Sequence, residues 1–202
     1  MWFATFFLLA WLSAIALGAD HAKVLFLTNS DRGQSSVHLA TAHALLRDYS
    51  DSVEIHFASF PDVAPAVAQA AGQADRKDGV NITFHPVQGT TYKQAIEAKG
   101  GTLEAVRHRP GLWGISDFLF LIERAFIPWT GPEYIEVSES IRGIVEDVRA
   151  DLVVIDIMYS PAVDAVEEIM GSGSHVFLAP NGLSVTLAKV QPQGKTLWRY
   201  PA

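Results

Sequence analysis

The feature that most constrains the fold is a short apolar run followed by a polar turn and a helix, within residues 23–47. The run KVLFLT is continuous and six residues long, which is typical of a strand buried on both faces. The segment NSDRGQ that follows favours a turn, in which Gly33 is able to adopt a positive φ. Ser35 or Ser36 is expected to cap a helix over 37–47. This unit predicts an α/β fold that presents backbone N–H groups to a ligand at a helix N-terminus.

The rest of the chain repeats this alternation of strand and helix patterns. Strands are expected over 52–58, 80–86, 151–156 and 175–179, and helices over 61–75, 92–98, 134–148 and 160–171. Such alternation predicts a Rossmann-like parallel sheet flanked by helices. In the strand order 3-2-1-4-5, the first and fourth strands are neighbours, and the crevice at their carboxyl ends is the expected ligand site.

This topology places the Gly33–Gln34 turn beside Asp156, which ends the fourth strand. A carboxylate there is costly to bury unless it is paired or hydrogen-bonded. Two interpretations of Asp156 remain open: it orients a base or holds a substrate hydroxyl, or it only accepts N–H bonds from the next loop. His38, one turn into the first helix, is either a base or a histidine that packs within the fold.

Composition excludes several classes of function. Apolar residues make up 49% of the chain and charged residues 18%, as in packed globular proteins. The net charge of -7, with no basic stripe, argues against a nucleic-acid partner. Cysteine is absent, so no disulfide or thiolate nucleophile forms. His38 and His43 are five residues apart and share no helix face, and no metal site is expected. The dinucleotide-binding, Walker and nucleophile-elbow motifs are also absent.

The first nineteen residues carry no charged side chain and end in small residues, which favours a cleaved signal peptide. A retained membrane anchor or a buried helix are the alternatives. A glycosylation sequon at 81–83 agrees with entry into the secretory pathway, so we expect location in the endoplasmic reticulum lumen or membrane, or secretion. The expected layout is a leader over 1–19, one Rossmann-like domain over 20–188 and a truncated tail over 189–202.

Aromatic residues gather between positions 112 and 129, including Trp113 and Phe118. At this spacing they are either core residues of a helix or walls of a pocket for an apolar ligand. Sequence alone leaves both interpretations open.

Three segments carry a resemblance to a known family. They are KVLFLTNSDRGQSSVHLATAHALL, DLVVIDIMYSPAVDAVEEIMG and VQPQGKTLWRYPA, at residues 23–46, 151–171 and 190–202. With them the chain resembles the N-terminal, acceptor-side half of a fungal-type family 1 UDP-sugar-dependent glycosyltransferase of the GT-B fold. The resemblance implies inverting transfer of a hexosyl group to a hydroxyl of an apolar small molecule. It implies no cofactor or metal, and the UDP-sugar is a donor substrate.

The resemblance also implies a set of site residues. The family's Gly-His pair, whose histidine deprotonates the acceptor, matches Gly33–Gln34 here, and the aspartate that orients this histidine matches Asp156. Glutamine has no basic nitrogen, so the base is missing unless His38 replaces it. The expected catalytic residues are therefore Asp156, Gln34 and His38, and the expected acceptor-binding residues are Gly33, Ser35, Trp113, Phe118 and Asn181.

No segment of the chain resembles the family's donor-binding domain. The expected function is therefore a glycosyltransferase portion that is inactive alone and that uses a UDP-sugar only when a second domain is supplied. Membrane association through the N-terminus is an additional expectation. Two alternatives are a non-enzymatic binder of an apolar small molecule, and another Rossmann-like enzyme such as a small hydrolase or reductase.

Overall fold

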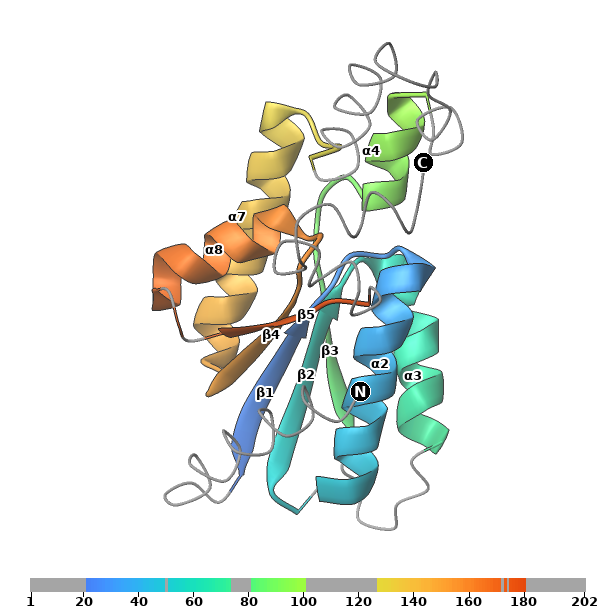
Figure 1. The fold of residues 1–202 in the computed structure, drawn as a ribbon, viewed down its shortest axis with the longest axis vertical. Helices are drawn as coiled ribbons and strands as arrows, with labels where there is room; N and C mark the ends of the chain where they lie inside the picture. Colours follow the sequence, from blue (N-terminus) through green and yellow to red (C-terminus); the bar gives the residue numbers. More distant parts are fainter. Residues whose placement is uncertain are drawn as a thin grey trace, which may run out of the picture.

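The computed structural model describes residues 21–49, 51–73, 81–100, 127–171, 173 and 175–180 of the 202-residue chain. In this part the chain forms one five-stranded parallel sheet with helices on both faces (Figure 1). Its strands are β1 (Ala22–Leu27), β2 (Val53–Ser59), β3 (Ile82–Pro86), β4 (Leu152–Asp156) and β5 (His175–Leu178). The order across the sheet is β3-β2-β1-β4-β5, and every neighbouring pair is parallel. The predicted fold class and strand order are confirmed.

Two separate cores lie on the two faces of the sheet. One face is covered by α2 (Arg32–Tyr49) and α3 (Ala64–Gln73), which follows the short 3-10 turn η1 (Pro61–Val63). The opposite face is covered by α7 (Gly131–Val148) and α8 (Ser160–Met170), and α4 (Tyr92–Ala98) lies beyond the carboxyl ends of the strands (Figure 1). The apolar run of β1 serves both cores: Val24 and Phe26 belong to the first, Leu25 and Leu27 to the second. Burial on both faces therefore explains why this run does not alternate with polar residues.

The boundaries and the buried face of helix α7 are explained by its sequence. Thr130 and Glu133 form a capping box at its start, and Arg149 ends it in the left-handed conformation at φ 52°. Its buried stripe recurs at helical spacing and packs on the sheet. The members of this stripe are Val137, Ile141, Val145 and Val148.

Several sequence predictions fall on residues outside the described part. The leader at 1–19, the tail at 189–202 and the aromatic positions 112–126 all lie there. Within the described residues, none of the helices combines the length and apolar character that crossing a membrane requires.

Gly89, between β3 and α4, is the glycine whose replacement is expected to be most disruptive. Its φ is 104°, and a Cβ atom would lie 2.9 Å from Cγ2 of Val137 on the buried side of α7. We therefore expect Gly89→Ala to lower the free energy of unfolding by about 1–3 kcal/mol. Urea denaturation followed by circular dichroism measures this change.

Gly143→Ala is the matched control. Gly143 is exposed within α7, and no atom lies within 4 Å of the position of its Cβ. This change is expected to raise the free energy of unfolding by about 0.5–1 kcal/mol, because alanine loses less backbone entropy in a helix. A Gly89→Ala protein as resistant to urea as the parent would contradict the close approach to α7.

Candidate functional site

The candidate site begins where two neighbouring strands end. Leu27 of β1 lies opposite Ile155 of β4, so the next residues of both strands meet at the carboxyl edge of the sheet. The Asp156 carboxylate is fully buried there. Thr28 Oγ1 and Asn29 Nδ2 donate to its Oδ2 at 3.3 and 3.2 Å. The convergence of the first turn with Asp156 on one rim, expected from topology, is confirmed by this contact.

The other oxygen of the same carboxylate is held by its own loop. The backbone N–H of Met158 donates to Asp156 Oδ1 at 2.9 Å. Burial raises the pKa of Asp156 to about 6, and the hydrogen bonds from Met158, Thr28 and Asn29 only partly offset this. Each interpretation of Asp156 is supported by one observation. The N–H bond from Met158 agrees with a structural role in the loop, and the fixed position of the carboxylate at the switch point of the sheet agrees with a functional role. Its ionisation near neutral pH is typical of functional carboxylates.

Helix α2 begins earlier than the sequence predicts, which corrects the turn around Gly33. Asn29 Oδ1 accepts the N–H of Asp31 at 2.7 Å, and this side-chain turn leads the chain into the helix at Arg32. Gly33, Gln34 and Ser35 consequently lie in the first helical turn.

The turn predicted over 29–34 is therefore too long, and the predicted serine cap is wrong. Gly33 is not among the residues with positive φ, and Ser35 does not cap the helix, because its hydroxyl donates to the carbonyl of Asp31 at 2.9 Å. Ser36, the other cap predicted, lies inside the helix as well. Gly33 has a different role: a Cβ there would lie 3.1 Å from Asp31 Oδ2, so glycine leaves space for that carboxylate.

Gln34 and His38 are neighbours on one face of α2. Gln34 is half-buried, and its Oε1 is enclosed without a hydrogen-bond partner among the described residues. The His38 ring is fully buried and donates from Nδ1 to the Gln34 carbonyl at 3.2 Å. It lies edge-on to Phe26, with ring centroids 6.5 Å apart. Burial lowers the pKa of His38, and backbone groups of Gln34 and Ile155 partly offset this. Across the described chain no hydrogen bond joins His38 to Asp156.

An aromatic cluster lies beside the carboxylate. Trp129, the described member of the aromatic segment, is buried, and its indole N–H donates to the Thr90 carbonyl at 2.7 Å. Its ring lies 6.0 Å from that of Tyr159, which is fully buried with a hydroxyl that has no partner among the described residues. Burial and then the charge of Asp156 raise the pKa of Tyr159. Burial, followed by Asp31 and Asp156, raises the pKa of Tyr92 to about 12. Buried aromatic rings thus pack beside one buried carboxylate at this edge of the sheet.

The remaining predicted site residues, Trp113, Phe118 and Asn181, lie outside the described residues. Sequence reasoning missed Thr28, Asn29 and Tyr159. The first two directly follow β1, and the rule that selected Asp156 at the end of β4 would also have selected them. Tyr159 gave no signal beyond its closeness to Asp156 in the chain.

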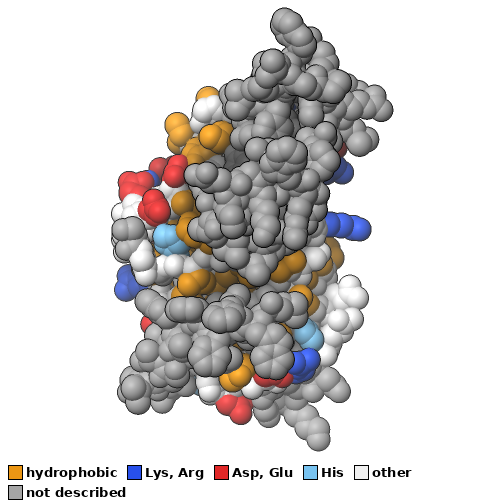
Figure 2. Space-filling model, viewed as in Figure 1, with side chains coloured by type: hydrophobic (Ala, Val, Ile, Leu, Met, Phe, Trp, Pro, Cys, Tyr) orange, Lys and Arg blue, Asp and Glu red, His pale blue; other side chains and the backbone are white. Residues whose placement is uncertain are grey.

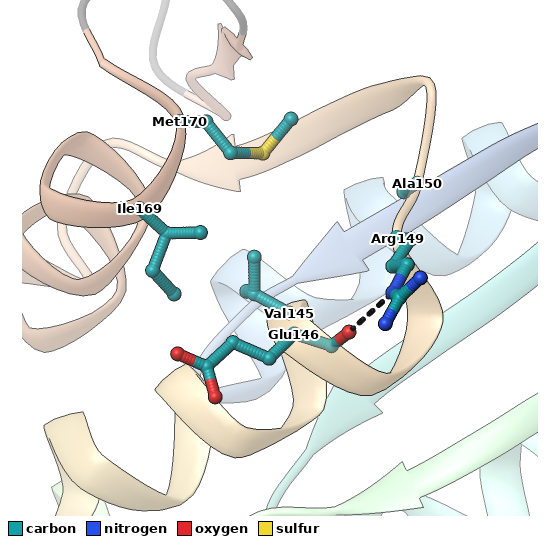
Figure 3. A pocket seen from close by; sticks show the side chains of 6 residues that line it. All are labelled: Val145, Glu146, Arg149, Ala150, Ile169 and Met170. Atoms are coloured by element: carbon teal, nitrogen blue, oxygen red, sulfur yellow. Dashed lines mark hydrogen bonds between the residues drawn. The ribbon is translucent and has the colours of Figure 1, made fainter.

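A pocket lies at the opposite edge of the sheet, where the strands begin. Figure 3 shows its lining, which comes from the C-terminal ends of α7 and α8 and encloses about 530 Å³. Arg149 Nε donates to the Glu146 carbonyl at its margin, at 3.4 Å. Residues Val145, Ala150, Ile169 and Met170 supply its apolar wall. The pocket is therefore separate from the carboxyl edge of the sheet, where Asp156 lies.

Charge is unevenly distributed over the visible surface. In Figure 2, Asp and Glu side chains gather at the left, over α8, and Lys and Arg side chains stand singly or in small groups. Arg142 of α7 pairs with Glu168 of α8, which ties the two helices together.

Comparisons with known proteins agree with this architecture. No family model matches the chain. It is 27% identical over 196 residues to the glycosyltransferase sdnJ of Sordaria araneosa, a match that covers 90% of this chain and 37% of that protein. The glycosyltransferase VinC, solved in complex with DTDP, has a TM-score of 0.51 and 17% identity, over 86% of this chain and 40% of VinC. The Streptomyces sp. SF2575 glycosyltransferase SsfS6 has a TM-score of 0.50 and 16% identity, over 79% of this chain and 39% of SsfS6.

These matches confirm the resemblance to GT-B glycosyltransferases that the sequence indicated. The chain has their parallel α/β fold, and it spans about two fifths of the length of the proteins it matches.

Proposed function

We propose that this chain is the acceptor-binding portion of a UDP-sugar-dependent glycosyltransferase that acts on a hydroxyl of an apolar small molecule. The observation that carries the proposal is the buried Asp156 carboxylate, held by Thr28 and Asn29 in the crevice between β1 and β4. It stands at the switch point of a sheet whose fold is that of glycosyltransferases. The buried rings of Trp129 and Tyr159 pack beside this carboxylate and make its surroundings apolar, which suits an apolar ligand.

In the proposed reaction the acceptor hydroxyl lies in this crevice and loses its proton to a base. The resulting oxygen attacks the anomeric carbon of the donor sugar, the bond from that carbon to UDP breaks, and the configuration inverts. A carboxylate in the position of Asp156 keeps the base in one tautomer and stabilises its charged form. Gln34 stands where the resembled family has that base, and an amide cannot take the proton.

Transfer further requires that the donor is held in line with the acceptor, and this orientation accounts for much of the rate. The chain spans 37% of the length of the Sordaria araneosa relative. We therefore propose that residues corresponding to the rest of that relative hold the UDP-sugar. The 202 residues by themselves are expected to transfer little or no sugar.

The test is incubation of the purified chain with UDP-glucose and a panel of sterols and phenolics, with glycoside formation followed by mass spectrometry. No product above the protein-free control is expected. Turnover by the chain alone would refute the proposed dependence on a second domain.

The presence of Gln34 in place of a base favours one alternative, a non-enzymatic binder of an apolar molecule. Equilibrium binding separates the two functions. A chain that binds sterols or phenolics, but that shows no UDP affinity and no transfer even when joined to a donor-binding domain, is a binder. A chain that gains transfer when so joined is part of an enzyme.

A further inference from the structure

Two histidines meet on the sheet, far from Asp156 and unrelated to the proposed transfer. His56 of β2 and His85 of β3 lie diagonally across the two parallel strands, because His56 faces Thr83 and His85 faces Ala58. His56 Nδ1 and His85 Nε2 are 2.9 Å apart, and the ring centroids are separated by 5.1 Å. Nitrogen atoms of two different strands therefore converge on one point.

A carboxylate behind the first ring fixes its orientation. His56 Nε2 lies 2.9 Å from Glu54 Oε1, and an ionised carboxylate only accepts hydrogen bonds. His56 Nε2 therefore carries the proton, and Nδ1 directs its lone pair toward His85. One proton, donated by His85 Nε2, then lies between the two rings. A histidine held by a carboxylate, with its other nitrogen free to ligate, is the arrangement found around bound zinc.

We propose that His56 and His85 form a binding site for a divalent transition-metal ion of the Zn²⁺ class, with Glu54 as the carboxylate that positions His56. The metal takes the place of the proton between the two nitrogen atoms. The proton on His85 Nε2 is exchanged through solvent for one on Nδ1, so His85 stays neutral in its other tautomer and no net proton is released. Imidazole nitrogen is a preferred ligand for zinc, copper and nickel.

Metal binding requires the two rings to separate and to rotate. Two nitrogens bound tetrahedrally at 2.0–2.1 Å from zinc lie about 3.3 Å apart, so the rings must separate by about 0.4 Å from their present contact, and each lone pair must turn by about 35° from the line between the nitrogens toward the metal. His56 is 7% exposed and held in place, whereas His85 is partly exposed on the edge strand and can move. Its exposure also admits the waters that complete the coordination.

The surrounding charges suit a cation. Asp147 of α7 is a further negative charge close enough to act on His85. Lys23 Nζ lies 3.9 Å from Glu54 Oε2, on the carboxylate oxygen that does not face His56. Within the described residues no group of three or more His, Cys, Asp or Glu side chains surrounds a single metal position. The site is therefore an exchangeable two-histidine site rather than a closed structural one.

The test is a calorimetric titration of the full chain, without a polyhistidine tag, with ZnCl₂, together with thermal denaturation with and without the metal. We expect one Zn²⁺ bound per chain and a higher Tm in its presence, because the metal binds the folded state and joins β3 to β2. His85→Gln keeps a donor to His56 Nδ1 but removes a ligand, so binding and the Tm increase should be lost. Glu54→Gln should weaken binding about 10-fold or more.

His21→Gln is the matched control, because His21 is exposed and outside this pair. It should leave Zn²⁺ affinity unchanged. The proposal is overturned if the parent chain binds Zn²⁺ no more tightly than the His85→Gln variant does. It is equally overturned if neither protein binds Zn²⁺.

Discussion

Gln34→His is expected to raise glycosyl transfer about 10²–10⁴-fold, the contribution that a positioned general base makes. The suitable protein is a chimera in which this chain replaces the matching 196-residue segment of the Sordaria araneosa relative, so that the part proposed to hold the donor is present. Residue 34 lies in the first turn of α2, at the same sheet edge as Asp156, and its side-chain oxygen has no described partner to lose. The prediction rests on the proposed function, and initial rates with UDP-glucose measure it.

Two controls separate a base from a change in packing. Gln34→Asn alters the size of the side chain without adding a basic nitrogen, and it should give no gain. Asp156→Asn combined with Gln34→His should lose most of the gain, because the imidazole then lacks its orienting carboxylate. A chimera that is folded by circular dichroism, yet transfers sugar at the same rate with and without the Gln34→His change, would show that this position does not face the acceptor.

Asp156 is expected to make the chain less stable as pH rises. Burial raises the pKa of this carboxyl from 3.8 to about 6, so the folded state holds the proton more tightly than the unfolded state. The stabilising effect of that proton is fully present below about pH 4 and is lost as pH rises through 6. A shift of about two pKa units corresponds to about 3 kcal/mol. Urea denaturation at pH 4 and pH 8 measures the free energies of unfolding.

Asp156→Asn isolates this effect from every other titrating group. The parent should lose about 3 kcal/mol of unfolding free energy between pH 4 and pH 8, and the variant should not, since its amide has no charge to bury. The unfolding free energy of the variant minus that of the parent should therefore be about 3 kcal/mol larger at pH 8. Asp151→Asn is the comparison at an exposed position, at the start of β4, where the carboxylate accepts the N–H of Lys23. A variant-to-parent difference for Asp156→Asn that stays constant over this range would contradict the raised pKa.

The arrangement of the sheet could be predicted because β1 and β4 are continuous apolar runs. Such runs of five or six residues have few alternatives to a doubly buried strand, and the crossover rules then leave a handful of strand orders, among which 3-2-1-4-5 is a common doubly wound one. The same reasoning placed Asp156 beside the end of β1. The stripe of α7 was equally readable, because its buried positions recur at helical spacing.

The start of α2 could not be predicted, because it depends on competition between turn residues. Gly33 and the two serines were all plausible at a helix boundary, but the Asn29 side chain captures the N–H of Asp31 and begins the helix earlier. The surroundings of His38 could not be predicted from the sequence for another reason. Its orientation depends on the Phe26 ring and on the height at which α2 crosses the sheet, and neither is encoded locally.

The crevice joins segments that are far apart along the chain: Thr28 and Asp156 are separated by 128 positions. During synthesis β1 can pair with β2 as soon as that βαβ unit has emerged, but its other edge waits for β4. A ribosome paused before residue 152 therefore exposes the unpaired side of a hydrophobic central strand, which is a template for association with other chains. Chaperone dependence should be greatest in this interval and should end when β4 is released.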